Sequence, residues 1–101
     1  MLKEAMMYSG RIWINKLDAL VGKAKNGRYF RKYRLINDNS FYTLTVFANK
    51  ASELFGIPET LVVRNLPVYP SKYQQGDKTY TVYCTELKDL LQHIKEDKTK
   101  E

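Results

Sequence analysis

The alternation of apolar and polar side chains along this chain predicts short strands rather than long helices. Residues 41–48 alternate most clearly, because one set of positions is apolar while the other is polar in its middle and aromatic at both ends. The apolar set, which we expect to face a core, consists of Tyr42, Leu44, Val46 and Ala48. The other set, which is typical of a partly exposed binding surface, consists of Phe41, Thr43, Thr45 and Phe47.

Two segments that precede this strand also alternate. In residues 11–15 we expect Ile12 and Ile14 to face inward and Trp13 to face outward. Residues 28–37 combine aromatic side chains with several cations, which favours a strand with one solvated face. The inward side chains of this second strand are predicted to be Tyr33 and Leu35, and the outward ones Lys32, Arg34 and Ile36.

Glycine, asparagine, aspartate and proline mark the connections and the ends of the later strands. Turns are predicted at residues 23–27, 38–40 and 75–77. Strands are predicted at residues 60–65 and 79–85, and we expect the first to fray or to bend into an extended arm because Pro67 and Pro70 limit ladder pairing. The side chains expected to share a face are Leu61 with Val63, and Tyr80 with Val82 and Cys84.

Two short helices complete the pattern. The first has Asn49 as its expected N-cap and ends at Gly56. Its inward side is predicted to be Ala51, Leu54 and Phe55, and the stripe of the second helix Leu87, Leu90, Leu91 and Ile94. Five strands with a helix between the third and fourth follow the chain order of the OB-fold barrel, so we predict a mainly β OB-fold domain over residues 1–94 and a charged tail over residues 95–101.

Composition narrows the class of protein. The 101 residues carry a formal net charge of +6, and eight of them are tyrosine, so a polyanion is the expected partner. One cysteine and one histidine exclude an intrachain disulfide and any metal site built from several of either residue. Without an apolar run near the ~20 residues that span a bilayer, and without a signal-peptide pattern, we expect a cytoplasmic protein with no membrane partner.

The charge is concentrated in residues 23–34, and no acidic residue occurs between Asp18 and Asp38. The cations of this stretch are Lys23, Lys25, Arg28, Arg31, Lys32 and Arg34, and the interleaved aromatic residues are Tyr29, Phe30 and Tyr33. Repeated cations contact backbone phosphates, while flat side chains stack on unpaired bases, so this composition favours single-stranded nucleic acid. The alternative is a solvated basic hairpin whose aromatic side chains belong to the core.

The chain resembles the single-stranded-DNA-binding proteins of bacteria and phages between Tyr8 and about Leu91. The resemblance depends on the order and spacing of several stretches together. They are Phe41-Tyr-Thr-Leu-Thr-Val-Phe47 with Asn49-Lys-Ala-Ser-Glu-Leu-Phe55, then Leu61-Val-Val-Arg-Asn-Leu-Pro67, Tyr69-Pro-Ser-Lys-Tyr73 and Gln75-Gly-Asp-Lys-Thr-Tyr-Thr-Val82. These stretches are similar to the third strand and its helix, the fourth strand, the long hairpin loop, and the return into the fifth strand.

The resemblance implies binding of single-stranded DNA by aromatic stacking and by lysine and arginine contacts to phosphate. It assigns Phe47 to the aromatic position that ends the third strand, and Tyr73 to the aromatic position in the following long loop. The sequence after Leu91 lacks the Gly/Pro-rich linker and the acidic tip with which bacterial members recruit other proteins. The short chain resembles phage, plasmid or primosomal relatives more closely, so the tetramer of the bacterial members is not carried over, and we expect a homodimer or a higher homo-oligomer.

The candidate nucleic-acid-binding residues come from both lines of reasoning. They are Trp13, Lys23, Lys25, Arg28, Phe30, Lys32, Arg34, Phe47, Lys72 and Tyr73. Trp13 has two open interpretations, a contact with a base or a contact with a second subunit. We assign Tyr33, Tyr42 and Tyr80 to the core or to a subunit interface.

No pattern in the sequence favours catalysis. The carboxylates are scattered over turns and helix ends, and we interpret Cys84 as a small core residue and His93 as a surface or packing residue. We therefore expect a non-enzymatic protein, with no metal and no cofactor, that binds single-stranded DNA during replication or recombination, alongside replication proteins as further partners. The alternatives are an interaction module that docks an acidic protein, and an RNA-binding protein.

Overall fold

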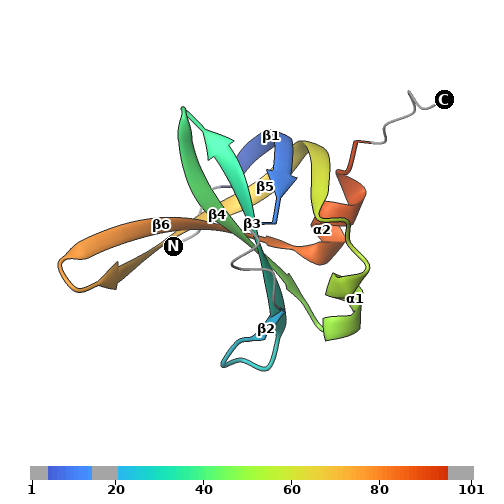
Figure 1. Ribbon diagram of the computed structural model, residues 1–101, viewed down its shortest axis with the longest axis horizontal. Helices are drawn as coiled ribbons and strands as arrows, with labels where there is room; N and C mark the ends of the chain where they lie inside the picture. The colour runs from blue at the N-terminus through green and yellow to red at the C-terminus, as the bar shows by residue number, and fades with distance from the viewer. Residues whose placement is uncertain (1–4, 15–20, 96–101) are drawn as a thin grey trace.

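The computed structural model describes residues 5–14 and 21–95 of the chain (Figure 1). Most of these residues lie in strands, so the predicted mainly β class is confirmed. The strands are β1 (Met6–Trp13), β2 (Gly22–Lys23), β3 (Tyr29–Asn37), β4 (Ser40–Ala48), β5 (Thr60–Gln75) and β6 (Lys78–Glu86), and the helices are α1 (Ala51–Phe55) and α2 (Leu87–Gln92). Neither helix in the described ranges is long and apolar enough to cross a membrane.

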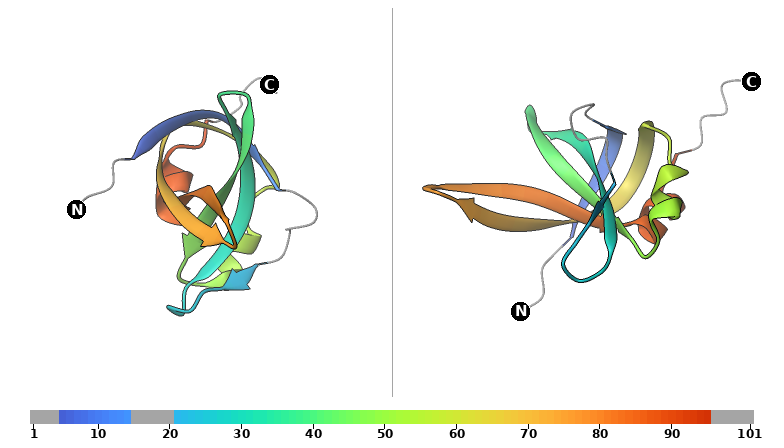
Figure 2. Two further views of the ribbon diagram at one scale, coloured as in Figure 1. Left: turned by 90° about the vertical axis from the view of Figure 1, so that its left-hand side faces the viewer. Right: turned by 60° about the horizontal axis from the view of Figure 1, so that its bottom comes forward.

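Hydrogen bonding between five of the strands closes into a ring. The order across the sheet is β1, β5, β6, β4, β3, β2, and β1 also pairs with β3 where Trp13 lies opposite Arg34. The β4–β6 pair is parallel and the other pairs are antiparallel. Figure 2 shows these strands curving around a common centre. The ring closes at that one β1–β3 pair, while the two-residue strand β2 remains at the edge of the sheet.

The inward side chains of alternate strand residues fill the centre of the ring. Tyr33 is fully buried, and its hydroxyl group donates a hydrogen bond to the carbonyl oxygen of Pro58 at 3.0 Å. The other large side chains that are fully buried are Ile12, Leu35, Leu44, Val46, Leu54, Leu66, Leu90, Val63 and Val68. Burial of each such aliphatic side chain stabilises the fold by about 1.5–3 kcal/mol relative to exposure. The inward faces predicted for the first four strands are confirmed, with Ile14 and Tyr42 half-buried at the margin.

β5 continues through both of its prolines, so of the two expected outcomes, fraying or bending into an extended arm, fraying does not occur. Arg64 and Asn65 together face Ser9 in a β-bulge, where Asn65 has a φ of 54° and its N–H group donates to Ser9 Oγ at 2.9 Å. The carbonyl oxygen of Pro67 accepts a hydrogen bond from Thr85 Oγ1 of β6 at 3.0 Å. In a strand, the N–H and C=O groups of one residue point toward the same neighbouring strand. Because the C=O group of Pro67 points toward β6, an N–H group at this position would point there as well. The proline therefore removes no hydrogen bond from the β1–β5 ladder.

Beyond the bulge, β5 passes from β1 to β6 and forms a hairpin arm. Residues 69–75 pair with residues 78–84, and residues 83–86 pair with β4 as well. The arm projects along the longest dimension of the molecule, which measures 50 Å against 31 and 30 Å for the other two (Figure 1). The predicted extended arm is therefore present, and it consists of two paired strands.

The helices differ from their predicted caps and faces. The N-cap of α1 is Lys50 rather than Asn49, and it makes no side-chain capping bond. Leu54 is buried but Phe55 is 64% exposed, because the side chains of adjacent residues in a helix point in directions about 100° apart. In α2, Leu87 and Leu90 are buried as predicted, whereas Leu91 is exposed. Beyond Lys95, the predicted charged tail lies outside the described residues.

The inward face of β6 is the opposite of the predicted one. Tyr83 and Thr85 are buried, whereas Cys84 is half-buried and Tyr80 is 40% exposed. Tyr80 lies in the part of β6 that pairs with β5 in the arm, away from the centre of the ring. The prediction that Cys84 is a core residue is therefore wrong, and of the two assignments given for Tyr80, the core and a subunit interface, the first is excluded.

Candidate functional site

The outward side chains of β3 and β4 form one surface, which we call the outward face. Its members are Phe30, Lys32, Arg34 and Ile36 of β3, and Phe41, Thr43, Thr45 and Phe47 of β4. The register places Phe30 opposite Phe47, Lys32 opposite Thr45, Arg34 opposite Thr43, and Ile36 opposite Phe41. The outward face is therefore aromatic or apolar at both ends and carries cations and hydroxyl groups in the middle, as the alternation of residues 41–48 predicted.

Phe30 and Phe47 form the first aromatic end. Their ring centroids are 6.1 Å apart with an interplanar angle of 62°. The Phe30 ring lies across the backbone of Gly22 in β2, because a Cβ atom added there would come within 2.5 Å of Phe30 Cζ. Lys32 Nζ lies 6.0 Å from the Phe30 ring centroid, and Arg28 Cζ lies 5.8 Å from that of Phe47. Two cations thus flank two aromatic rings that remain partly accessible.

Trp13 and Phe41 form the second aromatic end. Their rings meet edge to face with centroids 6.0 Å apart, and Trp13 lies opposite Arg34 in the register. Trp13 is half-buried on the outward side, as predicted. Around this pair is a groove of about 730 Å³, lined by Tyr8, Arg11, Trp13, Ile14, Ile36, Phe41, Glu59 and Thr60. Phe41 is 63% exposed and Ile36 45%, so this end presents apolar surface to whatever contacts it.

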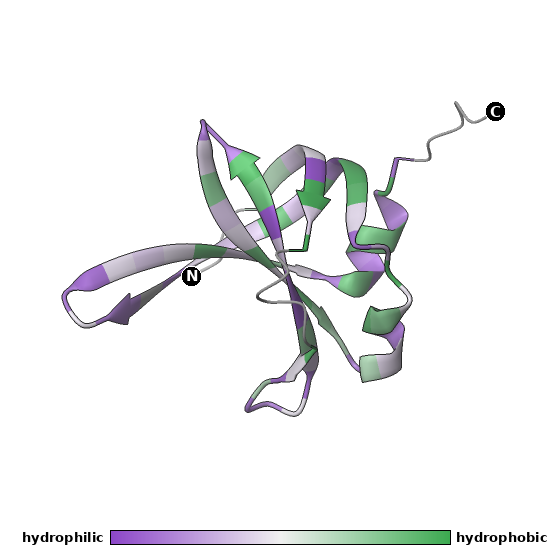
Figure 3. Cartoon of the chain, viewed as in Figure 1, coloured by the Kyte–Doolittle hydropathy of each residue, from purple (hydrophilic) through white to green (hydrophobic). Residues whose placement is uncertain are grey.

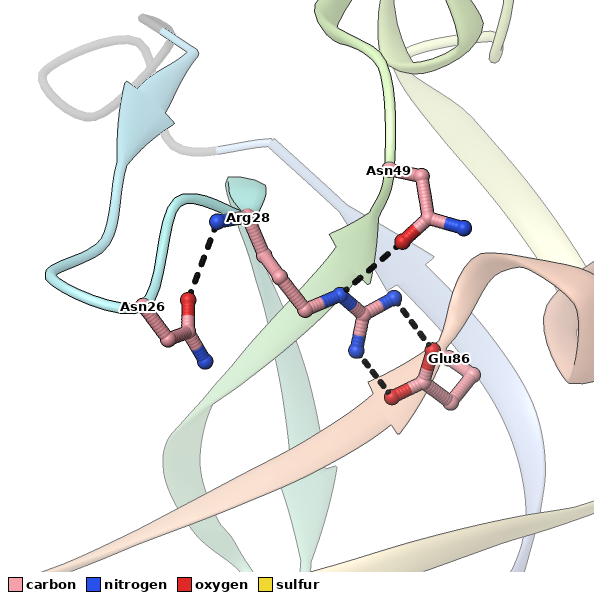
Figure 4. A network of polar contacts seen from close by, with 4 residues as sticks. All are labelled: Asn26, Arg28, Asn49 and Glu86. Carbon is pink, nitrogen blue, oxygen red and sulfur yellow. Dashed lines mark hydrogen bonds and ion pairs between the residues drawn. The ribbon is translucent and has the colours of Figure 1, made fainter.

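Arg28 lies in a network that the sequence did not indicate (Figure 4). Its Nη1 and Nη2 atoms donate to the two carboxylate oxygens of Glu86 at 2.7 and 2.6 Å, and its Nε atom donates to Asn49 Oδ1 at 3.2 Å. The hydrogen bond with Glu86 raises the pKa of Arg28, and the same bond lowers the pKa of Glu86. Asn26 Oδ1 accepts the backbone N–H group of Arg28 at 3.0 Å. The Arg28 charge is therefore positioned against Phe47 and is partly balanced by Glu86.

A second groove, of about 240 Å³, adjoins Phe47. Sequence reasoning missed Tyr69, which is 39% exposed and lines this groove together with Cys84 and Glu86. The registers Thr45↔Cys84 and Tyr69↔Cys84 extend the outward face of β4 across β6 to β5. The parallel β4–β6 pair that makes this connection joins segments about 40 residues apart, and no local pattern shows it.

Lys23, Lys25 and Lys72 lie away from the outward face. Lys23 Nζ lies 5.6 Å from the Tyr29 ring centroid at the β2 edge, and Lys25 is exposed in the turn that follows. Lys72 is exposed in the arm, where alternation places it on the opposite side of the ladder from Tyr69. Tyr73 pairs with Tyr80 through its backbone, but its side chain lies outside the described part of the structure. The tip of the arm and the turn after β2 are both hydrophilic (Figure 3).

One cation of the basic stretch belongs to the interior. Arg31 is buried, and its Nη1 atom donates to the carbonyl oxygen of Leu54 at 3.0 Å. The alternation that places Tyr33 and Leu35 inward also places Arg31 inward, so the sequence contained this signal. Arg31 therefore ties β3 to α1, and the basic surface is smaller than the stretch of residues 23–34 suggests.

Comparisons with protein-family models, with curated proteins and with solved structures gave no match to this chain. Among residues 5–14 and 21–95, no three His, Cys, Asp or Glu side chains lie close enough together to hold a metal ion. The geometry of the outward face and its two grooves is therefore the basis for a functional assignment.

Proposed function

We propose that this chain is an OB-fold protein that binds single-stranded DNA in the cytoplasm, without catalysing a reaction. Following the pairing around the ring gives β1, β3, β4, β6 and β5, with β4 parallel to β6. The α1 helix lies between β4 and β5 in the chain, which are the third and fourth strands of this ring in chain order. This order supports the OB-fold assignment, and the outward face corresponds to the side of the second and third strands on which that fold binds oligonucleotides.

The observation that carries the proposal is the neighbourhood of Phe47. Phe30 and Phe47 present ring surface, while Lys32 and Arg34 follow along the same face of β3 at alternate positions. From Phe30 to Arg34 the strand extends about 13 Å at ~3.3 Å per residue, which is long enough for more than one nucleotide. Each stacked base contributes roughly 1–3 kcal/mol, and phosphate contacts add a term that depends on salt.

The test is a titration with oligo-dT, oligo-U and a duplex of the same length, read by fluorescence anisotropy of labelled strands at two salt concentrations. We expect oligo-dT to bind most tightly, with log affinity falling linearly against log salt by about 0.7 per phosphate neutralised. Tighter binding of the duplex would contradict the proposal. A preference for oligo-U would redirect it to RNA, since stacking surfaces of this kind accept both polymers.

A protein-interaction module is the second candidate function, and the second aromatic end favours it. Phe41 and Ile36 expose apolar surface beside the 730 Å³ groove, and exposed apolar clusters commonly mark contacts with other chains. A protein of this second kind would bind oligo-dT weakly and would show no change of Trp13 fluorescence when oligo-dT is added.

A further inference from the structure

The groove beside Phe47 has the size and the aromatic lining of a site for one ring system. Phe47 of β4 and Tyr69 of β5 both line it, and Cys84 of β6 lies between their strands in the register. Its volume of about 240 Å³ is small, so it accommodates a single ring system rather than an extended ligand. The two aromatic side chains, with the half-buried Cys84 between their strands, provide surface on which such a ring can stack.

The rim of this groove offers one kind of hydrogen-bonding group that the rest of the outward face lacks. Glu86 lies directly opposite Phe47 and is the carboxylate among the groove's lining residues. Each of its oxygens accepts one hydrogen bond from Arg28, and a carboxylate oxygen has room for a second. Figure 4 shows Glu86 and Asn49 holding the Arg28 guanidinium from two sides, so the carboxylate is held in a defined orientation.

We propose that this groove takes one nucleobase of the bound strand and selects a base with an exocyclic amino group, so that cytosine is preferred to uracil or thymine. The inference depends on the single-stranded DNA binding proposed above. A carboxylate accepts a hydrogen bond from the N4 amino group of cytosine. Uracil offers instead an N3–H group recessed between two carbonyl oxygens, and these oxygens repel the carboxylate. Each Nη atom of Arg28 keeps one further N–H group beside Glu86, and cytosine carries its N3 acceptor next to the amino group.

Although Glu86 would select one base, its charge lowers the overall affinity for single-stranded DNA. Its negative charge lies beside the proposed path of a phosphate backbone, and a like charge in that place weakens the binding of every strand. A residue that served only to increase affinity would not be acidic here. Selection of a base gives the carboxylate a function that offsets this repulsion.

The test compares oligo-dC with oligo-dU of equal length near neutral pH, by anisotropy, for the wild type and for Glu86→Gln. We expect the wild type to bind oligo-dC roughly 5-fold more tightly, at the low end of what one side chain contributes to base discrimination. In Glu86→Gln we expect the ratio to fall to about 1 while the affinity for both oligomers rises. Glu53→Gln is the matched control, because it removes the same charge from an exposed position on α1 outside this groove, and its dC/dU ratio should equal that of the wild type.

The outcomes separate this inference from the proposed function. Equal wild-type affinity for oligo-dC and oligo-dU, with tight binding of both, overturns the base preference and leaves single-stranded DNA binding intact. A dC preference that persists in Glu86→Gln also overturns the assignment to this carboxylate. Failure to bind either oligomer would overturn the proposed function itself, and the base preference with it.

Discussion

Phe47 contacts three parts of the candidate site: Phe30 on one side, the Arg28 guanidinium on another, and the groove toward Tyr69. We expect Phe47→Ala to weaken oligo-dT binding by about 1–3 kcal/mol, or ~5- to 150-fold in Kd, because a stacking surface is lost. Anisotropy titration measures this change. Phe55→Ala is the matched control, because this substitution removes an equal ring at a position on α1 that is 64% exposed and lies away from the outward face. Equal losses in the two variants would count against stacking on Phe47.

Tyr33 links burial to alkaline stability. Burial raises the pKa of Tyr33 from its ordinary value of 10.0 to about 12. The folded state thus holds this proton more tightly than the unfolded chain, so the stability that Tyr33 contributes is complete below pH 10 and is lost as the pH rises toward 12. In Tyr33→Phe we expect a loss of about 1 kcal/mol at neutral pH, since the bond to Pro58 is removed, and a weaker dependence of stability on pH above 10. Urea unfolding at neutral and at alkaline pH tests this, and an unchanged alkaline dependence would contradict it.

At the residue scale, alternation in the sequence was sufficient to place many side chains correctly. It separated Tyr33 and Leu35 from Lys32 and Arg34, because period-2 patterning is a direct consequence of strand geometry. It did not indicate Glu86, whose contact with Arg28 joins residues 58 positions apart. Contacts of this kind depend on which strands become neighbours, and one strand's own pattern does not contain that information.

At the scale of elements, the two-residue strand β2 acts on the candidate site through Gly22. A Cβ atom at this position would lie 2.5 Å from Phe30 Cζ, so Gly22→Ala must push the end of the Phe30 ring aside. We expect a several-fold loss of oligo-dT affinity with a change in unfolding free energy within about 1 kcal/mol, because a side chain rather than backbone moves.

Gly56→Ala provides the control for this prediction. The nearest atom to an added Cβ at Gly56 is Glu53 O at 3.8 Å, which is an ordinary contact, and Gly56 has a φ of −83° that alanine adopts readily. Thermal unfolding and anisotropy of both variants separate the two effects. An affinity loss in Gly56→Ala as large as in Gly22→Ala would show that the Phe30 ring is not the cause.

The bounds and the inward face of an element were predictable where they depend on its own sequence, and were not predictable where they depend on a neighbouring strand. The sequence predicted the strand at residues 41–48, which β4 matches within one residue. It ended this strand at Asn65, whereas β5 continues to Gln75, because the effect of a proline depends on which neighbour its missing N–H group faces. Tyr80, Val82 and Cys84 alternate with the other residues of β6 as predicted. Which set faces inward depends on which part of β6 pairs with β4 in the ring and which part pairs only with β5 in the arm.

At the scale of the whole molecule, we expect a homodimer whose subunits meet at the second aromatic end. Phe41 and Ile36 are the exposed apolar side chains there, and a second copy would remove them from water. Sedimentation should give the mass of two chains for the wild type and of one chain for Phe41→Ser, whose fold is preserved because Phe41 is 63% exposed. Because this substitution adds no charge, oligo-dT affinity per chain should then stay unchanged. A wild-type mass of one chain would contradict the homodimer, and loss of oligo-dT binding in Phe41→Ser would assign this end to a base instead.

The continuous strand β5 forms one side of a hairpin arm whose length can change while the rest of the fold stays the same. Residues 78–82 pair with β5 and contribute no partner to β4, so the outer part of the arm closes no part of the ring. The arm turns at Gly76, an exposed residue with a φ of 65°. Adding one residue to each strand at that tip lengthens the arm by about 3.3 Å and leaves every side chain nearer the ring on its present side. Relatives or engineered variants can therefore vary in arm length through insertions at a single point, without disturbing the core.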